Sequence, residues 1–169
     1  RGAQSELFRV TYTGKDSTAP ARPGSDKFAG LRKLRRSLET FHGQQDPAAV
    51  QAALTHLGHA DRHIRYAARI ALEAQPVASW QDDVLDQDNP TALLTGVIAL
   101  ARQADKSLQP RLLKSLAKLD WAGLKTNNRL ALLRAYSLTF IRMGAPDQAT
   151  ATAVLAQLDK AFPVGDIRL

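Results

Sequence analysis

The sequence predicts an all-α fold of repeated helices that follows a short extended segment at the N-terminal end. Two observations carry this prediction. From about residue 26 onward, apolar residues recur at spacings of three and four, which is the period of an amphipathic helix. These stretches begin at pairs such as Asp46-Pro47 and Asn89-Pro90, in which a capping side chain precedes a proline at the first helical position. The helices are therefore expected to have starts that the sequence itself defines.

The N-terminal segment shows a different pattern. Residues 7–13 alternate apolar with polar side chains and are rich in β-branched and aromatic types, which predicts a strand. Residues 14–25 are rich in Gly, Ser, Thr and Pro and are expected to form a linker. A single strand needs a neighbour for its backbone donors and acceptors. Residues 1–25 are therefore predicted to be an extended strand and linker left from an upstream domain.

Residues 26–45 are expected to contain a leading helix that stops at Gly43. Its apolar positions fall three and four apart, at Phe28, Leu31, Leu34, Leu38 and Phe41. Basic side chains surround this stripe. The leading helix is therefore expected to have one apolar face and one solvated face.

Residues 46–169 are predicted to form about three helix pairs and an unpaired last helix. The shorter member of each pair is expected at 46–57, about 77–86 and 107–119, and the last helix at 146–161, starting at Pro146. The longer members are expected to start at Asp61, Asn89 and Asn127. Paired helices at a variable period of roughly 30–40 residues predict a HEAT-like α-solenoid of antiparallel helix pairs. A non-repetitive helical bundle with the same local signals is the alternative.

The sequence also predicts how these helices pack. Small residues such as Gly96 and Ala99 would let neighbouring helices approach closely. The aromatic side chains of Tyr66, Trp80 and Trp121 are expected to fill the core rather than to offer stacking surfaces. The third long helix is expected to bury a stripe formed by Leu130, Leu133, Tyr136, Phe140 and Ile141.

Composition limits the function classes. The chain has 169 residues, is 44% hydrophobic and contains no cysteine, which fits one ordinary domain or a run of small repeats. Without cysteine, a disulfide scaffold, a thiolate metal site, a cysteine nucleophile and a covalently attached haem are excluded. No apolar run approaches the roughly 18 residues of a membrane span. The chain opens on Arg1 without an initiator methionine and is expected to be a piece of a larger protein.

The net charge of +7 would suit nucleic acid, an anionic membrane surface or an acidic protein. An acidic stretch, formed by Asp82, Asp83, Asp86 and Asp88, interrupts the basic residues along the chain. This interruption favours solvated helix faces with a mild basic excess over a continuous nucleic-acid groove. The same stretch lacks the alternating ligands, central Gly and closing Glu of a calcium loop.

Three blocks of the sequence carry a resemblance to a known family: residues 6–15 (ELFRVTYTGK), 31–43 (LRKLRRSLETFHG) and 59–73 (HADRHIRYAARIALE). They resemble large exported proteins of planctomycete-type bacteria. Those proteins combine a sorbosone/glucose-dehydrogenase-like β-propeller, a HEAT-like helical region and a C-terminal c-type cytochrome. The likeness covers most of the chain and is generic from about residue 85 onward.

The resemblance implies that residues 7–13 correspond to a closing strand of the propeller. It also implies export to the periplasm or cell envelope, and a position between two redox modules. The haem attachment pattern Cys-x-x-Cys-His is absent from this chain, so none of the family's redox chemistry is carried over to its residues.

A row of arginines with nearby histidines is the candidate partner-binding surface. The row would lie on the inner face of the solenoid and could grip carboxylates or phosphates. The alternative is that Arg65 and Arg69 pair with acidic side chains such as Glu73. The candidate residues are Arg62, Arg65, Arg69, His59 and His63.

Other constellations are weaker. The histidines at 56, 59 and 63 are separated by Gly58 and the cap at Asp61, and exposed loop histidines are the preferred interpretation over a metal site. His63 with Asp61 is the nearest acid–base pair, and the two point in different directions. No catalytic, metal or cofactor residues are assigned.

The sequence therefore predicts a non-catalytic scaffold that docks proteins, either flanking domains of the same polypeptide or a redox partner. A nucleic-acid-binding HEAT-like domain is the alternative, resting on the basic charge and on analogy at the level of the fold.

Overall fold

The computed structural model describes residues 6–20, 26–162 and 165. Within these residues the chain forms eight α-helices and no strand, which confirms the all-α prediction. Short 3-10 turns at Val77–Ser79 and Lys106–Leu108 precede α4 and α6. The helices are α1 (Ala29–Glu39), α2 (Pro47–His56), α3 (Arg62–Glu73), α4 (Gln81–Leu85), α5 (Pro90–Gln103), α6 (Gln109–Ala117), α7 (Thr126–Met143) and α8 (Gln148–Asp159).

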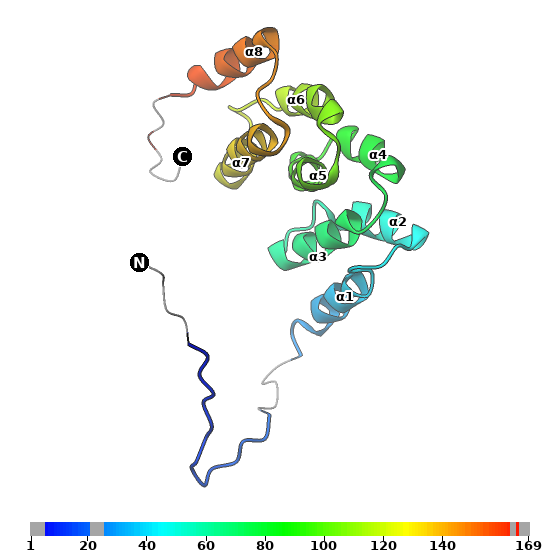
Figure 1. Ribbon diagram of the computed structural model, residues 1–169, viewed down its shortest axis with the longest axis vertical. Coiled ribbons are helices and arrows are strands. Elements are labelled where there is room, and N and C mark those ends of the chain that lie inside the picture. Colours follow the sequence, from blue (N-terminus) through cyan, green and yellow to red (C-terminus); the bar gives the residue numbers. More distant parts are fainter. Residues whose placement is uncertain (1–5, 21–25, 163–164, 166–169) are drawn as a thin grey trace.

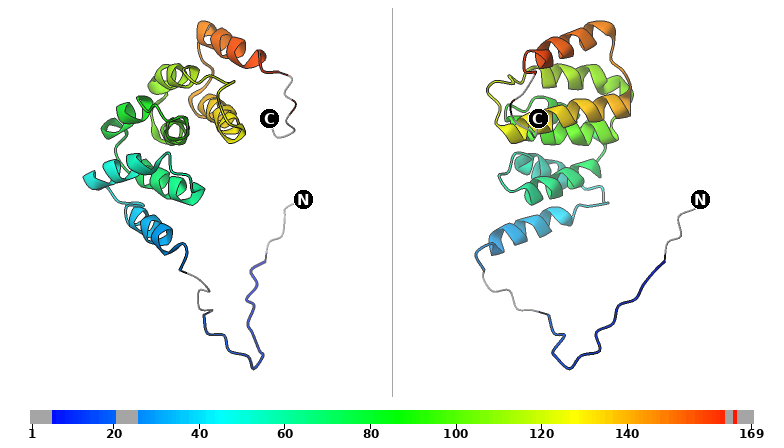
Figure 2. Two further views of the ribbon diagram at one scale, coloured as in Figure 1. Left: turned by 180° about the vertical axis from the view of Figure 1, so that it is seen from behind. Right: turned by 90° about the vertical axis from the view of Figure 1, so that its left-hand side faces the viewer.

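The helices are arranged in two layers along a curved row (Figure 1). Helices α1, α3, α5 and α7 form the inner layer on the concave side, and each packs against the next. Helices α2, α4, α6 and α8 form the outer layer, in which α2 packs against α3, α4 against α5 and α6 against α7. Figure 2 shows the same stacking from behind and from the side. The inner layer is thus a continuous surface made of successive helices.

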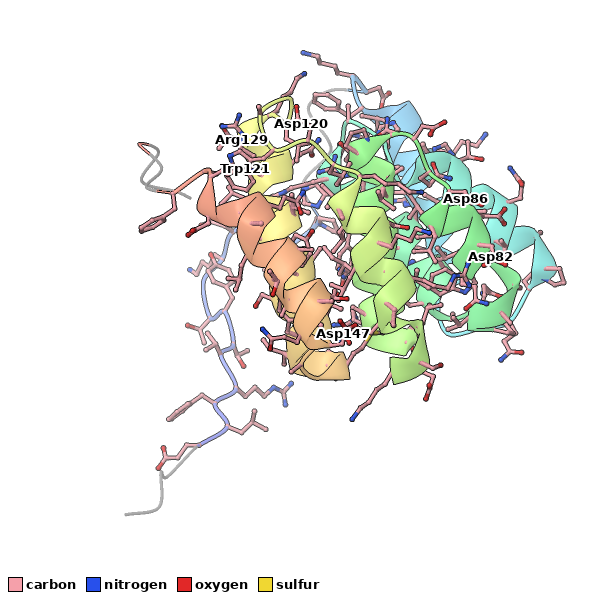
Figure 3. The ribbon with its side chains drawn as sticks, turned by 90° about the horizontal axis from the view of Figure 1, so that it is seen from above. Asp82, Asp86, Asp120, Trp121, Arg129 and Asp147 are labelled. Atoms are coloured by element: carbon pink, nitrogen blue, oxygen red, sulfur yellow. The ribbon has the colours of Figure 1, made fainter. Side chains whose placement is uncertain are left out.

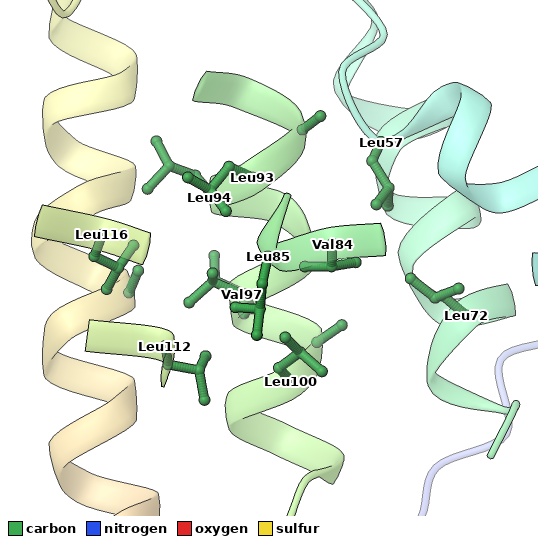
Figure 4. Close-up of a cluster of buried hydrophobic side chains, with 14 of the residues drawn as sticks. Leu57, Leu72, Val84, Leu85, Leu93, Leu94, Val97, Leu100, Leu112 and Leu116 are labelled. Atoms are coloured by element: carbon green, nitrogen blue, oxygen red, sulfur yellow. The ribbon is translucent and has the colours of Figure 1, made fainter. Parts of the chain in front are cut away.

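The core runs between the two layers and is centred on α5 (Figure 4). Val97 and Leu100 of α5 are completely buried, and Val84 of α4 and Leu112 of α6 approach them from the outer layer. Gly96 lets α4 approach closely, because a Cβ atom at this position would lie 2.5 Å from Cγ1 of Val84. The predicted role of Gly96 in close packing is therefore confirmed.

Side-chain caps fix the starts of three helices where the sequence predicts them. Asp46 Oδ1 accepts a hydrogen bond from the backbone N–H of Ala48 at 2.8 Å at the start of α2. Asp61 caps α3 in the same way, and Asn89 Oδ1 accepts from two backbone N–H groups at the start of α5. Each cap satisfies helix donors that have no partner within the helix.

The predicted starts of the last two helices are wrong. Helix α7 begins at Thr126 after Lys125, and no side chain caps it, so Asn127 lies inside the first turn. Helix α8 is capped by Asp147 rather than started at Pro146, because the Asp147 carboxylate accepts from the backbone N–H of Thr150 at 2.9 Å. A proline side chain has no acceptor for this role.

Two predicted apolar stripes are also corrected. Ile141 is 77% exposed, and the buried face of α7 consists of Leu132, Ala135, Tyr136, Thr139 and Met143. Because apolar residues occupy several sides of α7, spacing alone did not determine which side meets α5 and α6. Phe28 precedes α1 and is 54% exposed, so it lies outside the buried stripe of the leading helix.

Residues 6–20 form neither helix nor strand. The strand predicted at 7–13 is therefore not found, and its apolar side chains, such as Leu7 and Val10, are exposed. A strand needs a hydrogen-bonding neighbour, and none of the described segments supplies one. The rest of the predicted N-terminal region, residues 1–5 and 21–25, lies outside the described residues, as do 163–164 and 166–169 at the C-terminal end.

Candidate interaction groove on the inner layer

A groove of about 240 Å³ crosses the inner layer between α3, α5 and α7. We call it the inner groove. Helix α3 supplies a row of arginines and a tyrosine, and α5 and α7 supply uncharged polar and apolar side chains. The lining residues are Arg62, Arg65, Tyr66, Arg69, Thr91, Leu94, Thr95, Ile98, Asn127, Asn128 and Ala131.

The lining residues repeat at a fixed spacing along the chain. Positions 62, 65, 66 and 69 of α3 correspond to 91, 94, 95 and 98 of α5, and they lie on one face of each helix. Each pair is 29 residues apart, the same separation as between Glu73 and Arg102, whose side chains bond across these helices. Between α5 and α7 the separation is 37 residues, as in the bond from Thr91 Oγ1 to Asn128 Oδ1. Equivalent faces of successive helices therefore build the groove.

Asp61 fixes where the arginine row begins. Its Oδ1 accepts a 2.7 Å hydrogen bond from the backbone N–H of His63. This bond is the main reason why the pKa of Asp61 lies below its ordinary value of 3.8. The ionised cap sets the first turn of α3, and Arg62 follows directly from it.

Arg65 is partly engaged in the turn before α3. Its Nη1 donates to the backbone carbonyl oxygens of His59, at 2.6 Å, and Ala60, at 2.9 Å. The alternative prediction, that Arg65 pairs with Glu73, is therefore wrong. No described residue accepts from Nε or Nη2 of Arg65, so two of its three nitrogens remain available to a ligand.

Arg69 is bound to an acidic neighbour, as the alternative prediction has it. Its Nε lies 3.3 Å from Oε1 of Glu73, at ion-pair distance but without the geometry of a hydrogen bond. Glu73 Oε2 accepts a hydrogen bond from Arg102 at 3.1 Å. Because the Glu73 carboxylate is almost fully buried between two guanidinium groups, it offsets charge at this end of the groove.

Tyr66 differs from its prediction. It is 58% exposed, and the Arg69 guanidinium lies 5.2 Å from the centre of its ring. Its ring is therefore a wall of the inner groove rather than part of the core. Trp80, by contrast, is buried as predicted, and its Nε1 donates to the backbone oxygen of Gln75 at 3.2 Å.

Several hydrogen-bond donors of the groove have no partner among the described residues. Arg62 is exposed, and its one contact is a long bond from Nε to His63 Nε2 at 3.5 Å. The side chain of Asn127 makes no hydrogen bond with the described part of the chain, and the same holds for the amide nitrogen of Asn128. The groove lining contains no carboxylate, imidazole or thiol. It therefore offers donors to a ligand rich in acceptors.

The two predicted histidines do not line the inner groove. His59 stabilises the turn before α3, because its Nδ1 accepts from the backbone N–H of Asp61 at 3.0 Å. His63 lines a separate cavity of about 110 Å³ between α1 and α3, together with Arg32 and Arg35. Three of the five predicted residues are thus brought together, and the polar residues of α5 and α7 were missed.

The acidic stretch lies elsewhere. Figure 3 shows Asp82 on α4 and Asp86 directly after it, well apart from Asp147 at the start of α8. Asp82 Oδ1 accepts a hydrogen bond from Arg111 Nη2 of α6 at 2.6 Å. The Asp82 carboxylate therefore forms an ion pair between two outer helices. Among the residues that the structure describes, no group of three or more His, Cys, Asp or Glu side chains could hold a metal ion.

A further cavity, of about 460 Å³, lies where the loop between α6 and α7 meets α8. Asp120, Trp121 and Arg129 gather at this end of the molecule (Figure 3). Arg129 donates from Nε to the backbone oxygen of Trp121 at 3.0 Å and lies 5.5 Å from the centre of its ring. These contacts close the loop, and we assign them a structural role.

No helix in the described part of the chain combines the length and apolarity needed to cross a membrane. Comparison with models of protein families, with curated proteins and with solved structures finds no match for this chain. The inner groove is therefore the observation on which a functional argument must be built.

Proposed function

We propose that this chain is a HEAT-like α-solenoid that acts as a non-catalytic interaction domain. The inner groove is the observation that carries this proposal. Three successive inner helices contribute equivalent faces to it, at separations of 29 and 37 residues. Such translation from one helix pair to the next is typical of solenoids, whose concave surfaces bind other proteins.

The chemistry of the groove supports binding rather than catalysis. General acid–base work needs a positioned histidine, carboxylate or comparable group near the reacting atoms. The lining offers arginine, asparagine, threonine and tyrosine side chains around an apolar floor. Such a set can hold and orient a partner, while it contains no nucleophile paired with a base.

The resemblance described above supplies a context for this domain. We propose that it lies between a β-propeller and a c-type cytochrome in an exported protein of the periplasm or cell envelope. Its role there is to dock these redox modules, or a redox partner, at a fixed separation. The extended apolar segment at 7–13, whose side chains are exposed in the described chain, is consistent with a strand completed by another domain.

A binding experiment with site-specific cross-linking tests this function. The full 169-residue chain would carry a photo-reactive amino acid at Thr95, in the groove, or at Lys114, on α6 of the outer layer. Each variant would be mixed with the separately purified propeller and cytochrome of the parent polypeptide. We expect cross-links to at least one module from position 95, and none from position 114.

Two results would contradict the proposal. Binding of neither module would remove the docking role, and turnover of a substrate by the isolated chain would replace it with an enzyme. Duplex DNA is the control ligand: tight binding that weakens steeply with salt would favour the nucleic-acid alternative.

A further inference from the structure

The α3 wall of the inner groove carries arginine donors, and carboxylates offset only part of their positive charge. Arg69 is paired with Glu73, which it shares with Arg102, whereas Arg62 and Arg65 have no carboxylate in contact. The nearest carboxylate in sequence, Asp61, accepts from the backbone of α3 and caps it. The positive charge of the groove that no carboxylate contacts therefore lies at Arg62 and Arg65.

The charge is confined to one wall. The lining residues of α5 and α7 are all uncharged. A nucleic-acid strand carries a phosphate at every nucleotide and would need positive charge along its whole path. A ligand with one or two carboxylates at one end and an uncharged remainder fits this distribution better. The charge pattern therefore favours a peptide over a nucleic acid.

The groove also has a floor and a length. Leu94 and Ile98 form an apolar base and are almost fully buried, so a ligand lies over them rather than between them. Neighbouring helices are spaced about 8–10 Å apart, so the path from α3 to α7 is roughly 16–20 Å. An extended chain rises about 3.3 Å per residue, and about six residues therefore span it.

We propose that the inner groove binds an extended acidic peptide segment of about six residues, an inference that rests on the proposed function and names its partner chemistry. Arg62 and the free nitrogens of Arg65 bind a carboxylate of the segment at the α3 wall. The side-chain amide nitrogens of Asn127 and Asn128, which have no partner among the described residues, donate to its backbone carbonyl oxygens at the α7 wall. Apolar side chains of the segment rest on Leu94.

Fluorescence polarisation with three labelled probes tests this inference. The first probe is a six-residue peptide with two glutamates at one end and uncharged residues, leucine among them, at the other four positions. The second replaces each glutamate by glutamine, and the third is a six-nucleotide oligothymidylate. The protein is the full chain. We expect the glutamate peptide to bind at least about tenfold more tightly than either of the other probes.

Matched variants locate the site. Arg62→Glu reverses a charge that no carboxylate contacts, and it should weaken binding of the glutamate peptide by about tenfold or more. Lys114→Glu makes the same change in net charge on the outer helix α6 and should leave binding unchanged. Asn127→Ala removes only uncharged donors, and it should weaken the glutamate and glutamine peptides by the same few-fold factor.

The outcomes separate this inference from the proposed function. Equal affinity of wild type and Arg62→Glu, no binding up to about 1 mM peptide, or tighter binding of oligothymidylate would each overturn the inference. If a propeller or cytochrome still binds the chain in these cases, the docking role stands without the acidic segment. If the peptide binds as expected and neither module does, the groove is assigned and its physiological partner is a different acidic protein.

Discussion

Helices α5 and α7 occupy equivalent places in the inner layer, yet they are buried to very different extents. Helix α5 packs against α3 and α7 within its layer and against α4 and α6 of the outer layer. Nine of its 14 residues are buried. Helix α7 is longer, with 18 residues, but packs mainly against α5 and α6 and buries only five. Helix α5 is also the more apolar of the two, with one charged residue against three in α7, so the number of neighbours and the sequence of the helix agree in deciding how much of it is covered.

This difference in burial shows that the helices of the inner layer contribute unequally to the core and to the inner groove. A helix with neighbours on both sides supplies the core, while its remaining edge forms the floor of the groove. A helix with one inner neighbour keeps apolar side chains such as Ile141 exposed and offers polar ones such as Asn127 to the groove. Stability is therefore concentrated around α5, and four predictions test that concentration.

Truncation of Leu100 in α5 should have the largest effect. Its side chain is completely buried, so Leu100→Ala leaves a cavity and should lower the free energy of unfolding by about 2–5 kcal/mol. Ile141→Ala is the matched change in α7, where the side chain is 77% exposed, and it should cost less than about 0.5 kcal/mol. Urea denaturation followed by circular dichroism measures both. Similar losses for both variants would show that α7 is covered in solution.

Alkaline pH should lower the stability contributed by the buried phenol of Tyr136 in α7. Burial raises the pKa of Tyr136 from 10.0 to about 12, and its hydroxyl donates to Gln157 Oε1 of α8 at 2.8 Å. The unfolded chain loses this proton first as the pH rises, so the contribution is complete below pH 10 and is lost by about pH 12. Stability should fall by roughly 2 kcal/mol across this window.

Tyr136→Phe is the control for the alkaline prediction. It removes the titrating group and keeps the ring, so its stability should change less than that of wild type between pH 10 and 12. Because the two proteins differ only at residue 136, the difference between the two curves isolates Tyr136. Parallel curves would contradict the raised pKa.

Filling the close contact between α5 and α4 should have the next largest effect on stability. An alanine Cβ at Gly96 would lie 2.5 Å from Cγ1 and 3.2 Å from Cβ of the buried, β-branched Val84, which has little freedom to move. Gly96→Ala should therefore destabilise by roughly 1–2 kcal/mol, despite the better helix propensity of alanine. Gly30→Ala in α1 has open space and should stabilise by about 0.5–1 kcal/mol. Thermal unfolding of the two variants should shift in opposite directions.

The sequence predicted helices well where a side chain or a covered face defines them. Asp46, Asp61 and Asn89 mark helix starts by chemistry that operates within a few residues. The start of α7 was missed because no side chain caps it, and its buried face was misassigned because packing against α5 and α6 selects one of several apolar sides. Local chemistry is readable from the sequence, whereas a choice made by distant neighbours is not.

The candidate site likewise has one part that the sequence predicted and one part that it did not. The α3 wall was predicted because arginines three and four residues apart form a visible row. The polar residues that α5 and α7 contribute are threonines and asparagines, which are common in loops and helix starts and carry no distinctive pattern. A comparison of residues at the separation shared by Glu73 and Arg102, 29 positions, would have placed Thr91 opposite Arg62.

The smallest expected change in stability comes from removing a helix cap, and it distinguishes a residue that caps a helix from one that only lies near a helix start. Asn89 Oδ1 accepts from the backbone N–H groups of Thr91 and Ala92, at 2.9 and 3.1 Å, so Asn89→Ala should cost about 1 kcal/mol. The side chain of Asn127, at the same end of α7, has no hydrogen-bond partner among the described residues, so Asn127→Ala should leave stability within about 0.5 kcal/mol of wild type. Urea denaturation measures both changes. A loss at Asn127 equal to that at Asn89 would assign it a capping role, and its amide would then no longer be free for a ligand in the groove.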